Sequence, residues 1–189
     1  MAKRNKPIPI PAGVTVDKSD DKITVNGPQG QLSLKIHPTV AISIENNIIN
    51  VAEKKPDSSM FVGTAQSHLN NMIKGVTEGF TKIIEVRGMG YRAQKTKEGI
   101  QIEVGFIHPV NFKIPKEISV DIKQVPNPDD NKEQMFEITL KGADKQWVGE
   151  LAAEIRSTKK PDVYHGKGIR YKGEYVRKKA GKRAVATQA

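Results

Sequence analysis

The residues Gly30-Gln-Leu-Ser-Leu-Lys-Ile-His37-Pro38 alternate apolar and polar side chains and then end in Ile-His-Pro. Such alternation is typical of a strand with one buried and one exposed face. The stretch Ile100-Gln-Ile-Glu-Val-Gly-Phe-Ile-His108-Pro109 repeats this pattern, and its histidine lies 71 positions after the first. Alternation continues after each copy, at residues 40–44 and 110–114. The sequence therefore predicts two copies of one β-rich module, although short alternating strings can also match by chance.

Apolar residues at helical spacing follow the strands of each copy. They recur from Phe61 to Val76, and again from Val148 to Ile155 before Pro161 prevents continuation. The Val-Gly pairs in these two runs lie 86 positions apart, 15 more than the histidine offset of 71. The turn-forming string Pro126-Asn-Pro-Asp-Asp-Asn places the excess in an insertion around residues 125–131. The capping candidates are Asp57, Ser58 and Ser59 for the first helix and Asp144 for the second.

These patterns predict an α+β fold with two tandem copies of a small antiparallel β-sheet packed on one helix, plus a basic C-terminal extension. The expected divisions are residues 1–81 for the first module, 82–161 for the second module and 162–189 for the extension. Each module alone would bury only about 60% of its unfolded surface, so joining the two favours stability.

Composition excludes several classes of protein. The chain has 189 residues, of which 37% are hydrophobic and 28% charged, and this balance favours a folded chain over general disorder. We expect no membrane segment, because no apolar run approaches the length of about 20 residues that crosses a bilayer. We also expect no secretory signal. With no cysteine, disulfides, thiolate nucleophiles and cysteine-ligated metals are excluded.

The positive charge is concentrated near the C-terminus. The whole chain has 31 basic and 21 acidic residues, a net charge of +10, whereas residues 156–183 alone hold eleven bases and two acids, a net of +9. Three of the four tyrosines and four glycines lie in the same segment. Basic residues can meet phosphates, tyrosine can stack, and glycine lets a backbone approach closely. The segment therefore indicates contact with nucleic acid, with a solvated, membrane-surface or disordered segment as the alternative.

Other motifs give weaker signals. Gly88-Met-Gly90-Tyr-Arg-Ala93 fits a dinucleotide fingerprint, but a hairpin-like pattern follows it where a helix is needed. Gly166-Lys-Gly168 lacks the rest of a phosphate loop, and Asp129-Asp130 lacks the spaced ligands of a calcium loop. His37 and His108 precede prolines and are expected in turns, while His165 is either an RNA contact or solvated. Nothing in the sequence indicates catalysis.

The segment from Lys160 to Lys182 reads Lys-Pro-Asp-Val-Tyr-His-Gly-Lys-Gly-Ile-Arg-Tyr-Lys-Gly-Glu-Tyr-Val-Arg-Lys-Lys-Ala-Gly-Lys. It closely resembles the signature of the bacterial-type large-subunit ribosomal protein L6 family. Pro7-Ile-Pro-Ile-Pro11 resembles the family's opening, and Asn70-Asn-Met-Ile-Lys-Gly-Val-Thr-Glu-Gly-Phe80 its mid-chain helix and junction. Gly88-Met-Gly-Tyr-Arg-Ala-Gln94 resembles the start of its second module. The resemblance thus extends in order over most of the chain.

This resemblance implies two copies of one α+β fold and a structural, non-enzymatic role in the large ribosomal subunit. It also implies binding to large-subunit rRNA near the sarcin–ricin loop and the stalk base, beside neighbouring ribosomal proteins and docking translational GTPases. We expect no catalytic, cofactor-binding or metal-binding residue and no small-molecule substrate. From the matching motif, its basic continuation and the other bases of the segment, the expected RNA-binding residues are Lys159, Lys160, Tyr164, His165, Gly166, Lys167, Gly168, Ile169, Arg170, Tyr171, Lys172, Gly173, Arg177, Lys178, Lys179, Lys182 and Arg183.

Three departures from the family pattern affect these expectations. His165 stands where lysine is usual, which removes a full charge at neutral pH and puts one phosphate contact in doubt, and Val163 stands where proline is usual. Gln66-Ser67 replaces a commoner basic residue, which weakens the case for RNA contact by the first module.

The segment after Pro161 has few apolar residues, so we expect it to order on RNA, with its glycines letting main-chain N–H groups reach the sugar–phosphate backbone. A fragment that ends at Asp162 should then keep its melting behaviour and lose its affinity for RNA. Changing Arg170 and Lys167 to glutamate should impair RNA binding and leave both modules folded.

The expected location is the large subunit of a bacterial-type ribosome in the cytoplasm, with an organellar ribosome as the alternative. Two other classes stay open: a free-standing RNA- or DNA-binding regulator, and a nucleotide-using enzyme that binds phosphate at residues 88–93.

Overall fold

The computed structural model describes residues 7–19, 21–54, 59–127 and 130–179, without the side chains of residues 130–133. The chain divides into two compact units: unit 1 comprises Met1–Phe80 with Lys141–Val148, and unit 2 comprises Thr81–Leu140 with Gly149–Ala189. The predicted α+β class is confirmed, since each unit combines a helix with small sheets whose described registers are antiparallel. Each unit differs from the prediction in having two sheets instead of one.

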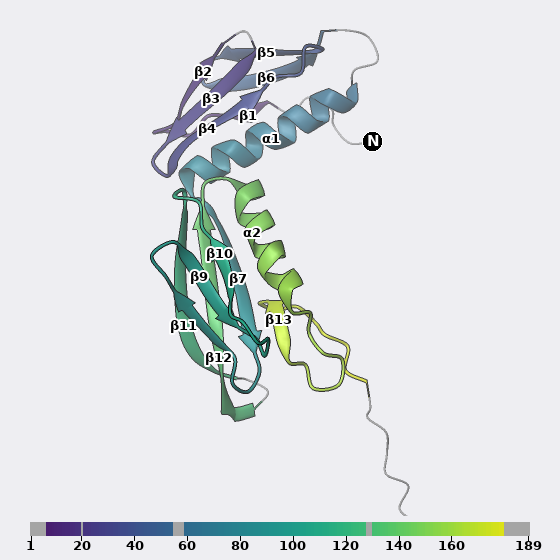
Figure 1. Cartoon of the computed structure of the whole chain (residues 1–189). Coiled ribbons are helices and arrows are strands. Elements are labelled where there is room, and N and C mark those ends of the chain that lie inside the picture. The colour runs from purple at the N-terminus through teal and green to yellow at the C-terminus, as the bar shows by residue number, and fades with distance from the viewer. Residues whose placement is uncertain (1–6, 20, 55–58, 128–129, 180–189) are drawn as a thin grey trace, which may run out of the picture. The chain divides into compact units, whose positions relative to one another are not determined.

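Unit 1 has two three-stranded sheets, with strand orders β1-β6-β5 and β2-β3-β4. Helix α1 packs against these sheets (Figure 1), and its apolar stripe, which includes Leu69 and Val76, meets strand residues such as Ile49 in a fully buried core. Asn46 and Asn47 have positive φ angles of 48° and 59° and form the two-residue turn between β5 and β6. Such a turn suits the twist of a hairpin. The bounds are β1 Ile8–Pro9, β2 Thr15–Lys18, β3 Lys22–Gly27, β4 Gly30–Lys35, β5 Val40–Glu45, β6 Ile48–Glu53 and α1 Ser59–Thr77.

Unit 2 has a three-stranded sheet, β10-β9-β8, and a four-stranded sheet, β11-β12-β7-β13. Its fully buried core residues are aliphatic and include Ile84, Ile138 and Ile155. The first turn of α2 is counted with unit 1, and the rest of the helix belongs to unit 2. The bounds are β7 Phe80–Arg87, β8 Arg92–Lys95, β9 Gly99–Glu103, β10 Val110–Lys113, β11 Ile118–Asn127, β12 Asp130–Gly142, α2 Lys145–Thr158 and β13 Gly168–Tyr171.

The glycine-rich turn at residues 88–91 leads into a strand. Tyr91 N donates to Gly88 O at 3.2 Å, and β8 begins at Arg92. A dinucleotide site needs a helix N-terminus at this point. The hairpin-like interpretation of the sequence is therefore confirmed.

Strand order reveals the internal repeat. In each unit the second, third and fourth strands form one sheet, and the sixth strand lies between the first and the fifth. The sheet β8-β9-β10 thus corresponds to β2-β3-β4, and β7, β12 and β11 correspond to β1, β6 and β5. The predicted match was wrong by one strand, because residues 30–38 contain a fourth strand and residues 100–109 contain a third. Alternation marks any half-exposed strand and does not say which one it is.

Loop hydrogen bonds give the correct register of the repeat. Val40 N donates to His37 O in unit 1, and Ile118 N donates to Pro115 O in unit 2, both at 3.0 Å. This match corresponds to an offset of 78 in place of 71, so Pro115, and not His108, occupies the position of His37. The helices of the two units are offset by 86 residues, which is eight residues more than the offset of 78 between their strands.

The excess of eight lies where the sequence places an insertion. Strands β11 and β12 have 10 and 13 residues, whereas β5 and β6 have six each. Of the turn residues between β11 and β12, 128 and 129 lie outside the described residues, as do the capping candidates Asp57 and Ser58. Helix α1 begins at Ser59.

The segment after Pro161 is part of unit 2. Strand β13 pairs antiparallel with β7 at the edge of the four-stranded sheet, and Ile169 is 0% exposed opposite Val86. The structure has residues 168–171 as a strand of unit 2, which differs from the expected ordering on RNA and from the expected start of an extension at residue 162. A buried isoleucine and a strand-to-strand ladder thus contribute to holding a polar segment that contains few other apolar residues.

Candidate nucleic-acid interface

The loop between α2 and β13 is closed by its own hydrogen bonds. Ile169 N donates to Lys159 O at 2.8 Å, Asp162 N donates to Lys167 O at 2.8 Å, and Gly166 N donates to Asp162 O at 2.9 Å. These contacts join the two ends of the loop, so the chain returns to the sheet directly after the helix. The loop thereby presents the side chains of its tip, residues 163–165, to solvent.

Asp162 organises the tip of this loop. Its Oδ2 accepts hydrogen bonds from the backbone N of His165 at 3.0 Å and pairs with His165 Nδ1 at 3.2 Å. The backbone N–H of His165 is the main reason that the pKa of Asp162 is lowered. His165 is exposed but held by this carboxylate, so its ring already has a partner within the loop.

Arg170 lies inside the unit, on the face of β13 opposite Glu85 of β7. Its Nε donates to Glu85 Oε2 at 3.2 Å. The Arg170 side chain is only 10% exposed and that of Glu85 only 6%. Changing Arg170 to glutamate would therefore place a second carboxylate against Glu85, so the structure predicts a loss of stability in unit 2 where the sequence analysis expected both modules to stay folded.

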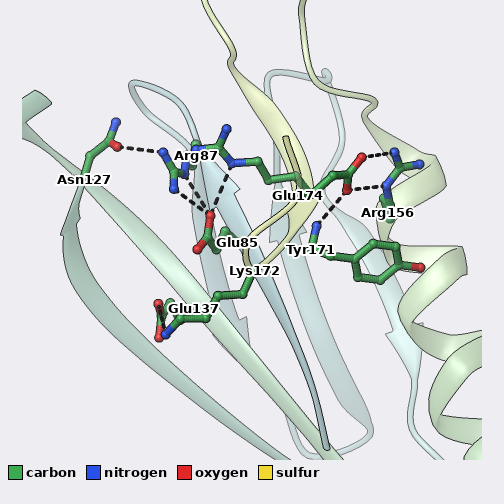
Figure 2. A network of polar contacts seen from close by, with 9 residues as sticks. Glu85, Arg87, Asn127, Glu137, Arg156, Tyr171, Lys172 and Glu174 are labelled. Atoms are coloured by element: carbon green, nitrogen blue, oxygen red, sulfur yellow. Dashed lines mark hydrogen bonds and ion pairs between the residues drawn. The ribbon is translucent and has the colours of Figure 1, made fainter. Parts of the chain in front are cut away.

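A second arginine shares the same carboxylate (Figure 2). Arg87 donates to Glu85 Oε2 from Nε at 3.0 Å and from Nη2 at 2.7 Å, and its Nη1 donates to Asn127 Oδ1 at 3.2 Å. Its side chain is 10% exposed. Glu85 and Arg87 are two residues apart on β7, so they share one face of the strand. The sequence analysis missed Glu85, Arg87 and Asn127, although a charged pair at alternate positions of an apolar strand was a signal.

A second ion pair joins helix α2 to the residues that follow β13. Arg156 on α2 donates from Nε to Glu174 Oε2 at 2.9 Å and pairs through Nη2 with Glu174 Oε1, while Tyr171 N donates to the same carboxylate at 3.0 Å (Figure 2). The Arg156 hydrogen bond is the main reason that the pKa of Glu174 is lowered. The Tyr171 ring has Arg156 Cζ at 5.5 Å and Lys82 Nζ at 5.7 Å from its centroid.

Gly168 has a steric role within the fold. Its φ is +146°, and a Cβ there would come within 2.6 Å of Pro161 Cα and 2.8 Å of Lys160 O. The backbone that approaches this glycine is therefore the chain's own loop. This packing explains the glycine without RNA, and the expected contact of its main-chain N–H with a sugar–phosphate backbone stays a prediction.

The expected RNA-binding residues separate by burial. Those that are buried, and so belong to the fold of unit 2, are Gly166, Gly168, Ile169 and Arg170. Those that are half-buried are Lys159, Lys167 and Tyr171, and Lys159 Nζ lies 5.0 Å from the centroid of the Phe106 ring. Those that are exposed are Lys160, Tyr164, His165, Lys172, Gly173, Arg177, Lys178 and Lys179, although Lys172 Nζ pairs with Glu137 Oε1 at 3.0 Å. Lys182 and Arg183 lie outside the described residues.

The basic loop before β13 and the basic stretch after β13 meet on the surface of unit 2. Lys179 N donates to Val163 O at 2.9 Å, which joins the chain after β13 to the loop tip. We call five exposed residues of these two stretches the basic surface: Lys160, Tyr164, Arg177, Lys178 and Lys179. It combines four cationic side chains with one exposed aromatic ring.

Comparison with known proteins identifies the family. Residues 10–79 and 87–172 match the family model described as Ribosomal protein L6. The chain belongs to the ribosomal protein L6 family. Among its relatives, the large ribosomal subunit protein uL6 of Listeria monocytogenes is 45% identical over 179 residues, which cover 94% of this chain and 95% of the relative. The corresponding proteins of Halalkalibacterium halodurans and Persephonella marina are 41% and 43% identical, each over 94% of this chain and over 96% and 94% of the relative.

Membership of the L6 family makes this protein a structural component of the ribosome and not an enzyme. The family match continues through Lys172 and so includes β13, the strand that the sequence analysis assigned to an extension. No helix within the described ranges is long and apolar enough to cross a membrane. Across the part of the chain that the structure describes, no group of three or more histidine or acidic side chains is arranged to hold a metal ion.

Proposed function

We propose that this protein binds large-subunit rRNA through the basic surface of unit 2. The observation that carries the proposal is the hydrogen bond from Lys179 N to Val163 O, because it brings two basic stretches onto one surface. Lysine and arginine there would displace condensed cations from the phosphates, and Tyr164 offers an exposed ring for stacking. Paired RNA is recognised mainly through shape, 2′-OH groups and phosphates, so we expect little reading of base sequence.

In this proposal β13 and the buried contacts of Glu85 with Arg87 and Arg170 position the basic surface, and the exposed side chains make the contacts with RNA. This division changes the choice of test residues. Arg170 is buried against Glu85, so its replacement would confuse unfolding with loss of RNA contact. Lys160 and Lys179 are exposed and belong to the two stretches that the Val163 contact joins, which makes them better probes.

The test neutralises these two lysines together, as Lys160→Gln with Lys179→Gln. If each contacts one phosphate, the slope of log affinity against log salt should fall by about 1.4–1.8 for an rRNA fragment. The matched control is Lys113→Gln with Lys116→Gln, which removes two exposed lysines elsewhere in unit 2. Equal slopes for the test and control variants would contradict the proposed interface.

We further propose that the basic surface faces rRNA near the sarcin–ricin loop and the stalk base, among neighbouring ribosomal proteins and beside docking translational GTPases. The family resemblance supports this location, and the bacterial relatives support a bacterial-type large subunit. The chain has no cysteine, so Tyr164→Cys creates a single attachment site for an iron chelate that generates hydroxyl radicals. Cleavage of large-subunit rRNA at these two elements is expected, and cleavage confined to other regions would refute the location.

Sedimentation of a cell lysate distinguishes this proposal from a free-standing RNA- or DNA-binding regulator. The chain should follow the large-subunit peak through a sucrose gradient and stay there at moderate salt. Recovery mainly in the post-ribosomal supernatant would favour the regulator.

A further inference from the structure

The loop that joins β9 to β10 in unit 2 presents two consecutive apolar side chains to solvent. Ile107 is 94% exposed and Phe106 is 48% exposed. The start of the loop is anchored, because Val104 is buried and a Cβ on Gly105 would come within 3.6 Å of Tyr91 Cε1. We call residues 104–109 the apolar loop. It holds hydrophobic groups in water on a fixed base.

A neighbouring turn adds a third exposed apolar side chain. Met89 is exposed within the turn at residues 88–91, and a Cβ on Gly88 would come within 2.7 Å of the Tyr91 ring. One tyrosine ring therefore lies against both the turn and the apolar loop. Single exposed apolar residues are common on protein surfaces, whereas adjoining stretches of them indicate a place where a partner binds.

The surroundings of the apolar loop favour a partner that carries negative charge. Neither the loop nor the turn contains an acidic residue. Glu103, which precedes the loop, lies opposite Arg92 in the register of β9 and β8. Lys159 Nζ lies 5.0 Å from the centroid of the Phe106 ring, and Lys160 of the basic surface is the next residue. The loop is thus continuous with the surface proposed to contact RNA.

An RNA base has the properties that these residues require. Its flat face stacks on aromatic side chains, and the phosphate of the same nucleotide attracts a lysine. Phe106 supplies the ring, and Lys159 supplies the cation beside that ring. Bases that are free of pairing, in loops and bulges, are the ones that a protein can stack in this way.

We propose that Phe106 and Ile107 hold an unpaired base of large-subunit rRNA. Phe106 stacks on the base, Ile107 packs against it, and Lys159 attracts the adjoining phosphate. The inference rests on the proposed function, because the basic surface brings the RNA to this part of unit 2. It adds a base contact to a surface that otherwise meets phosphates, and it uses residues outside the C-terminal segment.

The first test separates a base contact from a phosphate contact by its salt dependence. Phe106→Ala should weaken binding of the full-length protein to the rRNA fragment by at least about fivefold, the lower end of the effect of one base–aromatic contact. The slope of log affinity against log salt should not change, because no charge is removed. Lys159→Gln should instead lower that slope by about 0.7–0.9. Unchanged affinity for a folded Phe106→Ala protein would overturn the inference.

A second variant keeps the test valid if Phe106→Ala does not fold. Ile107 is almost fully exposed, so Ile107→Ala should leave urea unfolding of the protein unchanged and still weaken RNA binding severalfold. The matched control is Met60→Ala, which truncates an exposed apolar side chain on α1 in unit 1. Equal affinities of the Ile107→Ala and Met60→Ala proteins would also overturn the inference.

The third test identifies the class of partner. The chain has no cysteine, so Ile107→Cys gives the purified protein one site for an aryl azide label before large subunits are reassembled. Illumination should crosslink the label to rRNA. Crosslinks to another ribosomal protein alone would overturn the assignment to RNA and make the apolar loop a protein contact.

Failure of this inference differs from failure of the proposed function. If the Lys160 and Lys179 double variant lowers the salt slope but Phe106→Ala and Ile107→Ala bind as tightly as the unchanged protein, only the base contact is refuted. An unchanged slope for the lysine double variant refutes the basic surface itself.

Discussion

Replacing Ile169 by alanine tests whether β13 belongs to the fold of the RNA-free protein. Ile169 is fully buried and lies opposite Val86, which is also fully buried, on the edge strand of the four-stranded sheet. If the segment ordered only on RNA, as its composition suggests, this change would not affect the free protein. The structure predicts instead a large loss of stability without RNA.

The magnitude follows from the burial. Truncating a buried isoleucine to alanine costs about 2–5 kcal/mol, from lost transfer free energy and from the cavity left behind. We expect about 3 kcal/mol for Ile169→Ala, which raises the unfolding equilibrium constant of unit 2 about a hundredfold. For a unit of this size the melting temperature should fall by roughly 12–24 °C. Ile169→Val, which removes one methyl group, should cost about 1 kcal/mol.

Urea unfolding, followed by circular dichroism on samples shown by absorbance to be free of RNA, measures this loss. Because the two units can unfold separately, amide hydrogen exchange of residues 80–87 should be recorded as well, since faster exchange there places the loss at β7. Val163→Ala is the matched control, because Val163 lies in the same segment but is 37% exposed. If Ile169→Ala and Val163→Ala were equally stable, the assignment of β13 to the RNA-free fold would be refuted.

Three further changes test the contacts around β13. Gly168→Ala should cost at least about 2 kcal/mol, because it combines an unfavourable φ with backbone clashes, whereas Gly173→Ala, with a positive φ but open space around it, should cost about 1–2 kcal/mol; thermal unfolding compares them. Arg156 lowers the pKa of Glu174, so this group stabilises the fold above its unfolded pKa near 4.5 and loses that contribution as the pH falls through the lower folded value. Urea titrations from pH 7 to pH 3 should therefore show Glu174→Gln less stable at neutral pH and less sensitive to acid, and parallel pH profiles would contradict the ion pair. Glu85→Gln leaves two buried arginine side chains without their shared carboxylate and should cost about 3–5 kcal/mol in the same assay, so a loss below 1 kcal/mol would contradict the cluster.

Local periodicity predicted the helices because each has an apolar stripe that must be buried. The runs ending at Val76 and Ile155 became the buried faces of α1 and α2. The same signal failed for the register of the repeat. His37 and His108 follow similar alternating strings, yet one follows the fourth strand of its unit and the other the third. Alternation reports that a strand is half-buried and carries no information about the strand beside it.

The sequence predicted which residues make up the candidate interface, but it did not predict which of them are buried. The sequence located its cationic residues correctly in one segment, and Lys160, Tyr164 and Lys179 are indeed exposed. It assigned Arg170 to the same surface, because an arginine in a basic run resembles its neighbours. Only the pairing of β13 with β7 places Arg170 opposite Glu85, a residue 85 positions earlier.

The amino-acid sequence by itself determined the α+β class, the duplicated architecture, the family and the concentration of positive charge near the C-terminus. These properties depend on composition, on ordered motifs and on periodicities of two or 3.6 residues, all of which are local. The tertiary structure alone decided which strands pair, that Ile169 and Arg170 are both buried, and that two arginines share the Glu85 carboxylate. Those outcomes depend on contacts between distant residues, and a polar side chain is stable inside a protein only when such a contact supplies its partner.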